Sequence, residues 1–410
     1  MLDLFPLSAR VAGGVLTIGG VAADTLAAEH GTPLLVYCEE TIREQARAYR
    51  DAAPGALVVY GTKAFANVEL LRVLADEGVG ADVSTLGELA FARAAGIDGD
   101  RLIFHGNNKN DEELRAAAAA DAIVVLDVAE EVERAAEAGV RRVLVRLTPG
   151  VEAATHESIQ TAHASSKFGL SFESAAGAVD AARNRGLDVL GVHVHIGSQL
   201  ARIDESAVAV ERVVEFCEGL GWSPKLVDVG GGLAVRHNHE EAPPSVAEFV
   251  APLARIVRER FPESQLVLEP GRSLVGRAGV TLYRVGAAKE SGGVHWIAID
   301  GGMSDNPRPQ LYGARYEALL ANRAGELADG VFRVAGKHCE SGDVLIEAAE
   351  LPHPRRGDLL AVPATGAYTL AMGSTYNGVP RPAVVLVGDG RARLVRRRES
   401  TDDLLRYEQG

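Results

Sequence analysis

The chain has 410 residues, 47% of them hydrophobic, and a formal net charge of -14. The length allows two domains with a sizeable core, and the negative charge argues against nucleic acid or an anionic membrane surface as partner. No apolar run is long enough for a membrane span, and the N-terminus lacks a signal-peptide pattern. Cys38, Cys217 and Cys339 match neither a disulfide framework nor a zinc motif. We therefore expect a cytoplasmic protein without a metal site, in which Cys38 and Cys217 are buried.

Between about residues 56 and 270, short β-branched runs alternate with helical patterns. The predicted strands cover residues 56–60, 80–84, 102–106, 122–127, 142–147, 189–196, 226–230 and 266–270. This alternation predicts parallel strands covered by helices. Eight such units in roughly 215 residues match a (β/α)8 barrel of the TIM type. A doubly wound open sheet is the alternative, because alternation does not determine whether the sheet closes.

The sequence pattern changes after residue 280, where Gly, Pro and alternating strand patterns replace the helical runs. This pattern predicts a mainly antiparallel β domain. The N-terminal segment also has a strand-like pattern and is expected to join that domain. The predicted fold class is therefore α/β, with a cofactor-binding barrel over 36–280 and a β domain over 1–35 and 281–410 that completes the active site.

The C-terminal ends of barrel strands carry the chemistry in this fold, and nearly every predicted strand end here bears polar or glycine residues. The first predicted strand is followed by Lys63, one of only six lysines in the chain. A solvated surface lysine is the plain alternative. Later strand ends supply the glycine run Gly230–Gly232 and the carboxylate of Glu269.

Taken alone, the glycine run could be a flexible turn, although glycine backbone amides can also approach an anion closely. Glu269 could simply cap a turn, and His195 could be a packed barrel histidine. Together, however, a lysine, a phosphate cradle and a carboxylate for a pyridine nitrogen are the parts that hold pyridoxal 5′-phosphate. His195 is then placed to stack on the ring.

The motifs "YGTKAFAN", "ADVSTLGEL", "SSKFGLS", "GVHVHIGSQ", "DVGGGLAV", "EPGRSLVG", "DGGMSDNPRPQLYGA", "CESGD" and "GAYTLAMGSTYNG" occur in that order along the chain. In this respect the sequence resembles the fold-type III pyridoxal-phosphate decarboxylases, which share the alanine racemase-like barrel. Within that group it closely resembles the diaminopimelate decarboxylase family over essentially the whole chain. The resemblance implies decarboxylation of meso-2,6-diaminopimelate to L-lysine and carbon dioxide, in lysine biosynthesis.

The resemblance also implies residue roles. Lys63 attaches the cofactor covalently, and Glu269 pairs with its ring nitrogen. The remaining cofactor-binding residues are Asp82, His195, Ser198, Gly230, Gly231, Gly232, Gly271, Arg272 and Tyr368. The substrate, which has an amino-acid group at each end, is bound by Arg272, Arg308, Tyr312, Glu340 and Tyr368. Guanidinium groups suit its carboxylates, since they form bidentate hydrogen bonds.

Cys339 lies among charged residues in "KHCESGD", a poor setting for an inert core thiol. The resemblance makes it the proton donor after carbon dioxide has left. In the family this cysteine comes from the second subunit of a dimer, so a homodimer with shared active sites is implied. Without the resemblance, Arg308 would be interpreted as a surface arginine and Tyr368 as a core tyrosine.

Two positions depart from the family's lysine motif, which is similar to Tyr-Ala-X-Lys-Ala-Asn. Gly61 stands in place of the Ala, and Phe65 stands where Asn is usual. The substrate alternatives are therefore ornithine, arginine, carboxynorspermidine or a specialised-pathway amino acid. A racemase is disfavoured by "CESGD". A non-catalytic regulatory homologue is the alternative from another class, and intact Lys63, Glu269 and Cys339 disfavour it.

Overall fold

The computed structural model describes residues 2–150 and 166–409, and the chain forms two compact units. The barrel unit comprises Glu44–Ala234 and Pro243–Ser273. The β unit comprises Met1–Arg43, Val235–Ala242 and Leu274–Gly410. The expected assignment of residues 36–280 to the cofactor-binding domain, and of residues 1–35 and 281–410 to the β domain, stays a prediction.

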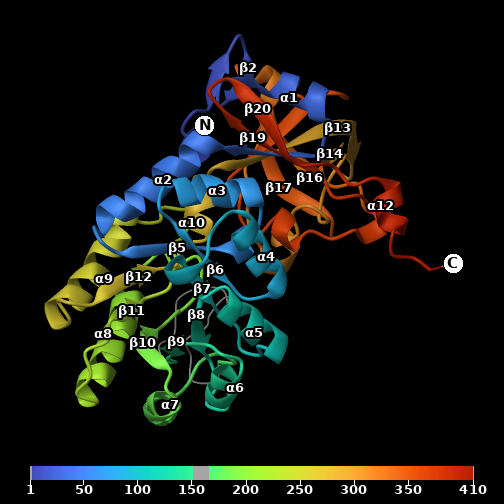
Figure 1. Cartoon of the computed structure of the whole chain (residues 1–410). Helices are drawn as coiled ribbons and strands as arrows, with labels where there is room; N and C mark the ends of the chain where they lie inside the picture. The colour runs from blue at the N-terminus through green and yellow to red at the C-terminus, as the bar shows by residue number, and fades with distance from the viewer. Residues whose placement is uncertain (1, 151–165, 410) are drawn as a thin grey trace. The chain divides into compact units, whose positions relative to one another are not determined.

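The barrel unit is built on eight parallel strands that close on themselves (Figure 1). The strands are β5 (Leu57–Gly61), β6 (Gly80–Val83), β7 (Leu102–Phe104), β8 (Ile123–Leu126), β9 (Arg142–Arg146), β10 (Asp188–His193), β11 (Leu226–Asp228) and β12 (Gln265–Leu268). Closure is made where β12 pairs with β5, with Val267 opposite Leu57 and Leu268 opposite Val58. The predicted barrel is confirmed, and the open-sheet alternative is wrong because the first and last strands pair.

Branched apolar side chains fill the barrel interior. The cluster contains Val59, Ile103, Ile123, Val125, Leu144, Leu190, Leu226 and Val267, each at most 8% exposed. These residues come from all but one of the eight strands, so the interior is a packed core, as expected for this architecture. The polar strand ends lie beyond that core.

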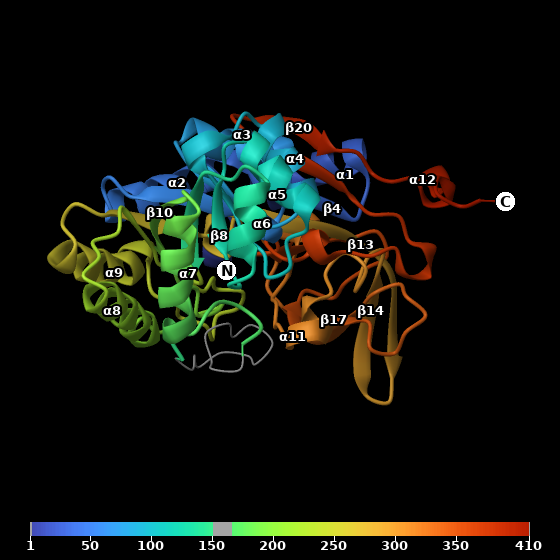
Figure 2. The same ribbon diagram turned by 60° about the horizontal axis from the view of Figure 1, so that its bottom comes forward.

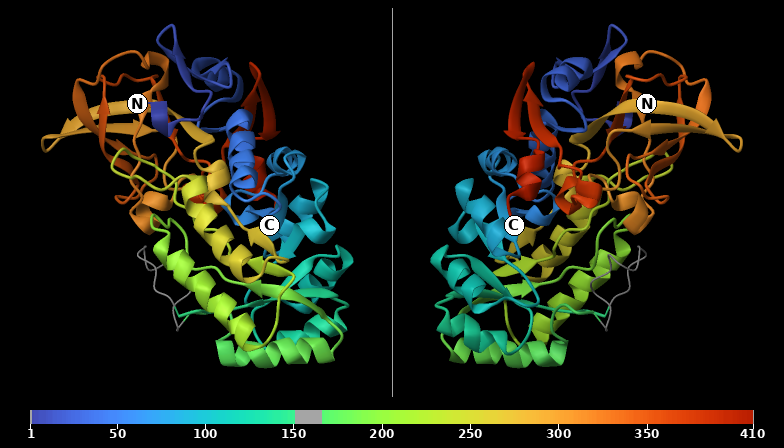
Figure 3. Two further views of the ribbon diagram at one scale, coloured as in Figure 1. Left: turned by 90° about the vertical axis from the view of Figure 1, so that its left-hand side faces the viewer. Right: turned by 90° about the vertical axis from the view of Figure 1, so that its right-hand side faces the viewer.

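Helices cover the outside of the barrel, and Figure 3 shows α7 in green and α8 in yellow-green running outside the strands. The helices of this part of the chain are α2 (Glu39–Ala52), α3 (Val68–Asp76), α4 (Leu86–Ala94), α5 (Asp111–Ala119), α6 (Glu131–Glu137), α7 (Phe172–Asn184), α8 (Asp204–Gly219) and α9 (Val246–Arg260). Several begin at side-chain caps that the sequence provides. Asn110 and Ser245 each form a capping box, in which the cap and a glutamate three residues later satisfy two backbone N–H groups.

The β unit contains a nine-stranded sheet that is mainly antiparallel. Its strands are β4 (Leu34–Cys38), β13 (Gly279–Ser291), β14 (Val294–Ile299), β15 (Leu319–Leu320), β16 (Gly330–Ala335), β17 (Val344–Leu351), β18 (Leu359–Pro363), β19 (Ala383–Gly388) and β20 (Arg391–Arg396). Two pairs, β14 with β16 and β4 with β19, are parallel. Figure 2 shows β13 and β14 as a long hairpin, drawn in orange.

The N-terminal segment contributes to the β unit in two ways. Strand β4 pairs with β13 and β19 in the large sheet. The preceding strands β1 (Arg10–Ala12), β2 (Val15–Ile18) and β3 (Val21–Ala22) form a small sheet of their own. They are followed by α1 (Ala23–His30), whose apolar side chains share a core with the large sheet.

Cys38 and Cys217 are buried free thiols, as predicted, and Cys339 is exposed. Burial raises the pKa of Cys217 to about 12, which keeps this thiol protonated and unreactive at neutral pH. Among the described residues, no helix is both long and apolar enough to cross a bilayer.

Candidate active site

Lys63 lies in the short 3-10 turn Thr62–Ala64 that directly follows β5. Two hydrogen bonds fix this turn to neighbouring strand ends: Thr62 Oγ1 donates to the Asp82 carbonyl over 2.7 Å, and the Gly61 amide donates to the Pro270 carbonyl over 3.1 Å. A Cβ at Gly61 would stand 3.4 Å from Asp82 Oδ2, which is an ordinary van der Waals contact, so alanine would also fit at this position. Lys63 is exposed, and its positive charge adds to the effect of burial in lowering the pKa of His195.

The second departure from the family motif, Phe65, is buried just after this turn. Its carbonyl accepts a hydrogen bond of 3.1 Å from the Tyr60 hydroxyl. The bulky side chain is thus enclosed at the residue that follows the lysine turn.

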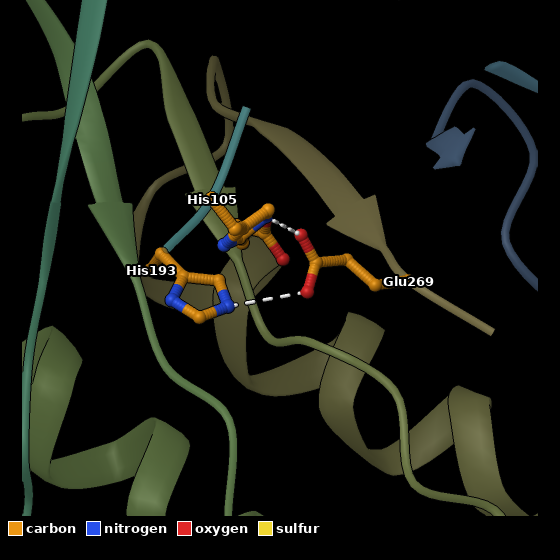
Figure 4. Close-up of side chains that lie close together, drawn as sticks. His105, His193 and Glu269 are labelled. Carbon is orange, nitrogen blue, oxygen red and sulfur yellow. Dashed lines mark hydrogen bonds and ion pairs between the residues drawn. The ribbon is translucent and has the colours of Figure 1, made fainter. Parts of the chain in front are cut away.

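A buried carboxylate lies at the end of β12. Glu269 Oε1 is 2.6 Å from His105 Nε2, and Glu269 Oε2 is 3.2 Å from His193 Nε2 (Figure 4). The two imidazoles meet edge to face, with ring centroids 4.8 Å apart. Burial alone would raise the pKa of Glu269, but its close contacts with the ring nitrogens of His105 and His193 hold it well below its ordinary value. Glu269 is therefore an ionised carboxylate in a dry setting.

Burial also determines the state of His193, whose pKa is lowered to about 3 although Glu269 acts in the opposite direction. A neutral imidazole still donates through its Nε2–H. His193 thus supports the Glu269 carboxylate without adding a charge.

Asp82 and Arg146 add one charge of each sign at the ends of β6 and β9. Burial raises the pKa of Asp82 to about 6, against the effect of His105. Burial lowers the pKa of Arg146, whose guanidinium lies 4.5 Å from the ring centroid of Phe168 and 3.6 Å from Asp127. Both charges are buried at the strand ends, where little water screens them.

The glycine run follows β11 and has no room for side chains. A Cβ on Gly230 would lie 2.7 Å from His195 Nδ1, and one on Gly231 would lie 2.1 Å from the Glu269 carbonyl oxygen. Gly230 and Gly232 also have positive φ angles of 69° and 111°, which glycine adopts at little cost. Close packing therefore requires glycine here, and the expected contact of this backbone with an anion stays a prediction.

Neighbouring loops contribute polar groups to the glycine run. The Gly231 amide donates to His195 Nδ1 over 3.2 Å, so that nitrogen is an acceptor and the ring is neutral. Burial lowers the pKa of His195 well below its ordinary value, with Lys63 acting in the same direction. Arg272, the first residue of α10 (Arg272–Val275), follows Gly271 and donates from Nη2 to Ser198 Oγ over 3.2 Å.

The barrel unit thus gathers one group of the predicted residues at the C-terminal ends of its strands: Lys63, Asp82, His195, Ser198, Gly230, Gly231, Gly232, Glu269, Gly271 and Arg272. Arg308, Tyr312, Cys339, Glu340 and Tyr368 lie in the β unit. Sequence reasoning gave no role to His105, His193, Asp228 or Arg146. Their position at strand ends was the available signal.

Arg308 is only 3% exposed and begins α11 (Arg308–Tyr312), directly after Pro307. Its Nη1 lies 2.9 Å from His237 Nε2 and 2.5 Å from the Tyr316 hydroxyl. His237 Nδ1 in turn lies 3.2 Å from Glu241 Oε2. The guanidinium is thus held on one side by a network of hydrogen bonds, unlike that of a solvated surface arginine.

The loop that carries Cys339 is fixed from inside and exposed outside. The Asp343 carboxylate accepts hydrogen bonds from the backbone amides of Met303 and His338, over 2.7 and 3.0 Å. Its Oδ2 also lies 2.6 Å from His338 Nδ1. Cys339 and Glu340 are both exposed. The Cys339 amide donates to Asn377 Oδ1 over 2.9 Å.

The two tyrosines of the predicted site differ in backbone conformation. Tyr312 ends α11, and its hydroxyl lies 4.0 Å from Met372 Sδ. Tyr368 has a φ of 58°, a left-handed conformation that is costly for a bulky residue and often accompanies function.

The residues of the barrel unit fit pyridoxal 5′-phosphate. The glycine run offers a backbone without side chains, packed so closely that any Cβ would clash with protein atoms, and Glu269 offers an ionised carboxylate in a dry setting. Lys63 supplies an amine at the adjacent strand end. A phosphate, a pyridine nitrogen and an aldehyde are the three groups that these residues match.

Comparison with known proteins agrees with this fit. The family described as pyridoxal-dependent decarboxylase, pyridoxal binding domain, matches residues 39–276. A diaminopimelate decarboxylase of Actinosynnema pretiosum subsp. auranticum is 44% identical over 417 residues, covering 99% of this chain and 95% of that protein. The chain belongs to the diaminopimelate decarboxylase family.

Solved structures of the family have the same fold. A diaminopimelate decarboxylase from M. jannaschii superimposes with a TM-score of 0.92 at 32% identity, covering 98% of each chain. A second structure of that enzyme, in co-complex with L-lysine, gives a TM-score of 0.90 at 32% identity, covering 97% of each chain. The cofactor of this pyridoxal-dependent family is pyridoxal 5′-phosphate.

Proposed function

We propose that this chain is a pyridoxal-phosphate-dependent enzyme that decarboxylates meso-2,6-diaminopimelate to L-lysine and carbon dioxide. The observation that carries the chemistry is the combination of Lys63, the glycine run and ionised Glu269 at one end of a closed barrel. The substrate follows from relatives of that name that match the chain over nearly its full length. The cofactor-binding part corresponds to residues 36–280, with residues 1–35 and 281–410 completing the active site.

When bound, the cofactor supplies an electron sink next to the carbon that loses carbon dioxide. Lys63 holds it covalently through its amine. Glu269, kept ionised by His105 and His193, favours a protonated ring nitrogen. The glycine run Gly230, Gly231 and Gly232 would line the phosphate site, together with Gly271, Arg272 and Ser198. Asp82, His195 and Tyr368 complete the contacts.

The substrate is held at both ends by groups suited to an amino acid. Arg272 and Arg308 pair with carboxylates, Glu340 pairs with the distal ammonium, and Tyr312 and Tyr368 line the site. Support for Arg308 comes from its burial and its bonds to His237 and Tyr316, which restrict the guanidinium before the substrate arrives.

Cys339 donates the proton that replaces the lost carboxylate, and it does so in the active site of a partner subunit. The exposure of Cys339 and Glu340, on a loop fixed from inside by Asp343, supports this proposal. The functional assembly is therefore a homodimer with shared active sites. Three free cysteines are consistent with the reducing cytoplasm that we propose as its location.

Product analysis tests the proposed function. The holoenzyme is offered meso-diaminopimelate, ornithine, arginine and carboxynorspermidine in parallel, and carbon dioxide and amine products are quantified by mass spectrometry. We expect one L-lysine and one carbon dioxide per diaminopimelate, with much slower turnover of the others. Preferred turnover of another amino acid would correct the substrate. No turnover of any, with cofactor bound, would favour a regulatory homologue.

A further inference from the structure

Asp228 is a fully buried acid at the end of β11, between β10 and β12 in the barrel. Its backbone pairs with His193 on one side and with Val267 on the other. Its Oδ1 accepts a hydrogen bond of 2.9 Å from the amide of Gly230, the first glycine of the cradle. One oxygen of this acid is thus committed to the glycine run.

The other oxygen, Oδ2, is buried and has no hydrogen-bond partner among the described residues if Asp228 is treated as a carboxylate. The Asp228 side chain clusters with those of Glu269, His105 and His193, and one nitrogen or oxygen atom from each of the four lies within 4.8 Å of the others. A buried ionised oxygen without a donor is strongly disfavoured. Two neighbouring carboxylates in a dry site also cannot both keep their charge.

The hydrogen bonds decide which of the two acids carries the proton. Both oxygens of Glu269 face imidazole nitrogens, at 2.6 and 3.2 Å (Figure 4). Asp228 receives a single backbone amide. Two side-chain donors favour the ionised form of Glu269 more than one amide favours that of Asp228. A proton on Asp228 Oδ2 turns the unmatched oxygen into a donor whose acceptor is Glu269.

The other charged groups around Asp228 do not reverse this assignment. Asp82 on β6 and Glu269 on β12 both favour the neutral form of Asp228. Arg146 on β9 favours its ionised form, but Asp127, Glu269 and Asp82 act on the same guanidinium more strongly. Burial, followed by the charge of Glu269, raises the pKa of Asp228 well above its ordinary value.

We propose that Asp228 is a neutral carboxylic acid whose O–H group donates a hydrogen bond to Glu269. It thereby connects the Glu269 carboxylate, the proposed partner of the pyridine nitrogen, to the glycine run. It is a positioning residue, since it acts through Glu269 and Gly230. A carboxylate offers about four acceptor sites, and His105, His193 and Asp228 would occupy three. This leaves Glu269 restrained, with one site for a further donor. The positioning role rests on the proposed function, whereas the protonation state does not.

Isoelectric focusing of the folded holoenzyme tests the protonation state. Asp228→Asn replaces a neutral acid by a neutral amide that can make the same two hydrogen bonds. The sequence implies an isoelectric point of about 5.3. We expect Asp228→Asn to focus together with the wild type, while Asp180→Asn, which changes an exposed acid on α7, shifts by one charge. An equal shift of both variants would overturn the proposal.

Kinetics and cofactor affinity test the positioning role. Asp228→Leu has nearly the same size but can make neither hydrogen bond. Losing a hydrogen bond to a charged group typically costs about ten- to a hundredfold, so we expect kcat to fall by that factor in Asp228→Leu. Its apoprotein should also bind pyridoxal 5′-phosphate more weakly in a fluorescence titration. Asp228→Asn should retain both properties within about threefold. Equal loss in both variants would overturn the role, and failure of the wild type to process any substrate would instead overturn the proposed function.

Infrared spectroscopy keeps the proposal testable if Asp228→Asn does not fold. Wild-type enzyme labelled with carbon-13 in its aspartate carboxyl groups is measured at pH 8, where Asp82 and Asp305, with pKa values of about 6, are ionised. We expect an isotope-shifted band of a protonated carboxylic acid. Its absence would show that Asp228 is ionised and would overturn the proposal.

Discussion

Glu269 of the barrel unit and Cys339 of the β unit are presented in opposite ways. In the barrel unit, Glu269 is 7% exposed and hydrogen-bonded to two histidines of the same unit. In the β unit, Cys339 and Glu340 are exposed on a loop whose internal bonds are made by Asp343. The site around Glu269 is suited to binding a group among buried residues of its own unit. The other offers a thiol and a carboxylate outward, as expected of residues that serve a second chain.

The contrast also separates two physical tasks. Buried charges keep their strength because little water screens them, which suits fixing and polarising a cofactor. A proton donor must instead reach its target and then be reprotonated from solvent. The predictions below test this division, from the largest expected effect to the smallest.

The largest effect is expected from Lys63→Ala, which removes the covalent attachment in the barrel unit. We expect kcat to fall by at least about a thousandfold, and the cofactor to be removed by gel filtration. The matched control is Lys225→Ala, since Lys225 is exposed and its ammonium pairs with Asp188 over 3.0 Å; this variant should keep activity. Covalently retained cofactor in Lys63→Ala would remove Lys63 from its role.

A smaller but still large effect is expected from Cys339→Ala in the β unit. Loss of a positioned proton donor lowers rates by about a hundredfold or more, while cofactor content should stay unchanged because the thiol takes no part in binding it. Cys217→Ala changes a buried thiol and should leave the rate nearly intact. If both variants retain full activity, Cys339 is not the proton donor.

Arg308→Ala tests the buried part of the β unit. A lost charge-assisted hydrogen bond corresponds to roughly ten- to a hundredfold in binding, so KM for diaminopimelate should rise by that factor with cofactor content unchanged. Arg315→Ala, which breaks only an exposed pair with Glu240, is the control. An unchanged KM would exclude Arg308 from substrate binding.

The smallest effect concerns stability and is expected from Asp305, the β unit's counterpart of Asp82. Both are buried acids whose pKa burial raises to about 6. A folded-state pKa above the unfolded value stabilises the protein below about pH 4, and this contribution is lost as the pH rises through 6. Relative to Asp305→Asn, the free energy of unfolding should therefore fall by at most about 1.4 kcal/mol per pH unit in this window.

Urea unfolding at pH 4 to 7 measures that slope. Asp329→Asn, at an exposed position of the same unit, should run parallel to the wild type. A parallel course for Asp305→Asn as well would mean that Asp305 is ionised throughout.

The barrel was predictable because each buried parallel strand leaves a continuous apolar run in the sequence. The limits of the eight strands were within a few residues of those observed. Closure was harder to predict, since the pairing of Val267 with Leu57 joins residues more than 200 positions apart. Local patterns contain no information about such a contact.

The site was predictable to the extent that chemistry is concentrated at strand ends. Lys63, Glu269 and the glycine run were found in this way. The partners of Glu269 were not, because His105 and His193 reach it only after the barrel has closed. The burial of Arg308 was also hidden, because its bond to His237 joins residues 71 positions apart within the β unit.

The measurement that most directly tests the division between the two units is subunit complementation. Inactive Lys63→Ala and inactive Cys339→Ala enzymes are mixed in equal amounts and allowed to exchange subunits. Random exchange makes about half of the dimers mixed, each with one intact site, so about a quarter of wild-type activity should return. No recovery after proven exchange would mean that Lys63 and Cys339 serve one site from a single chain, which contradicts the account.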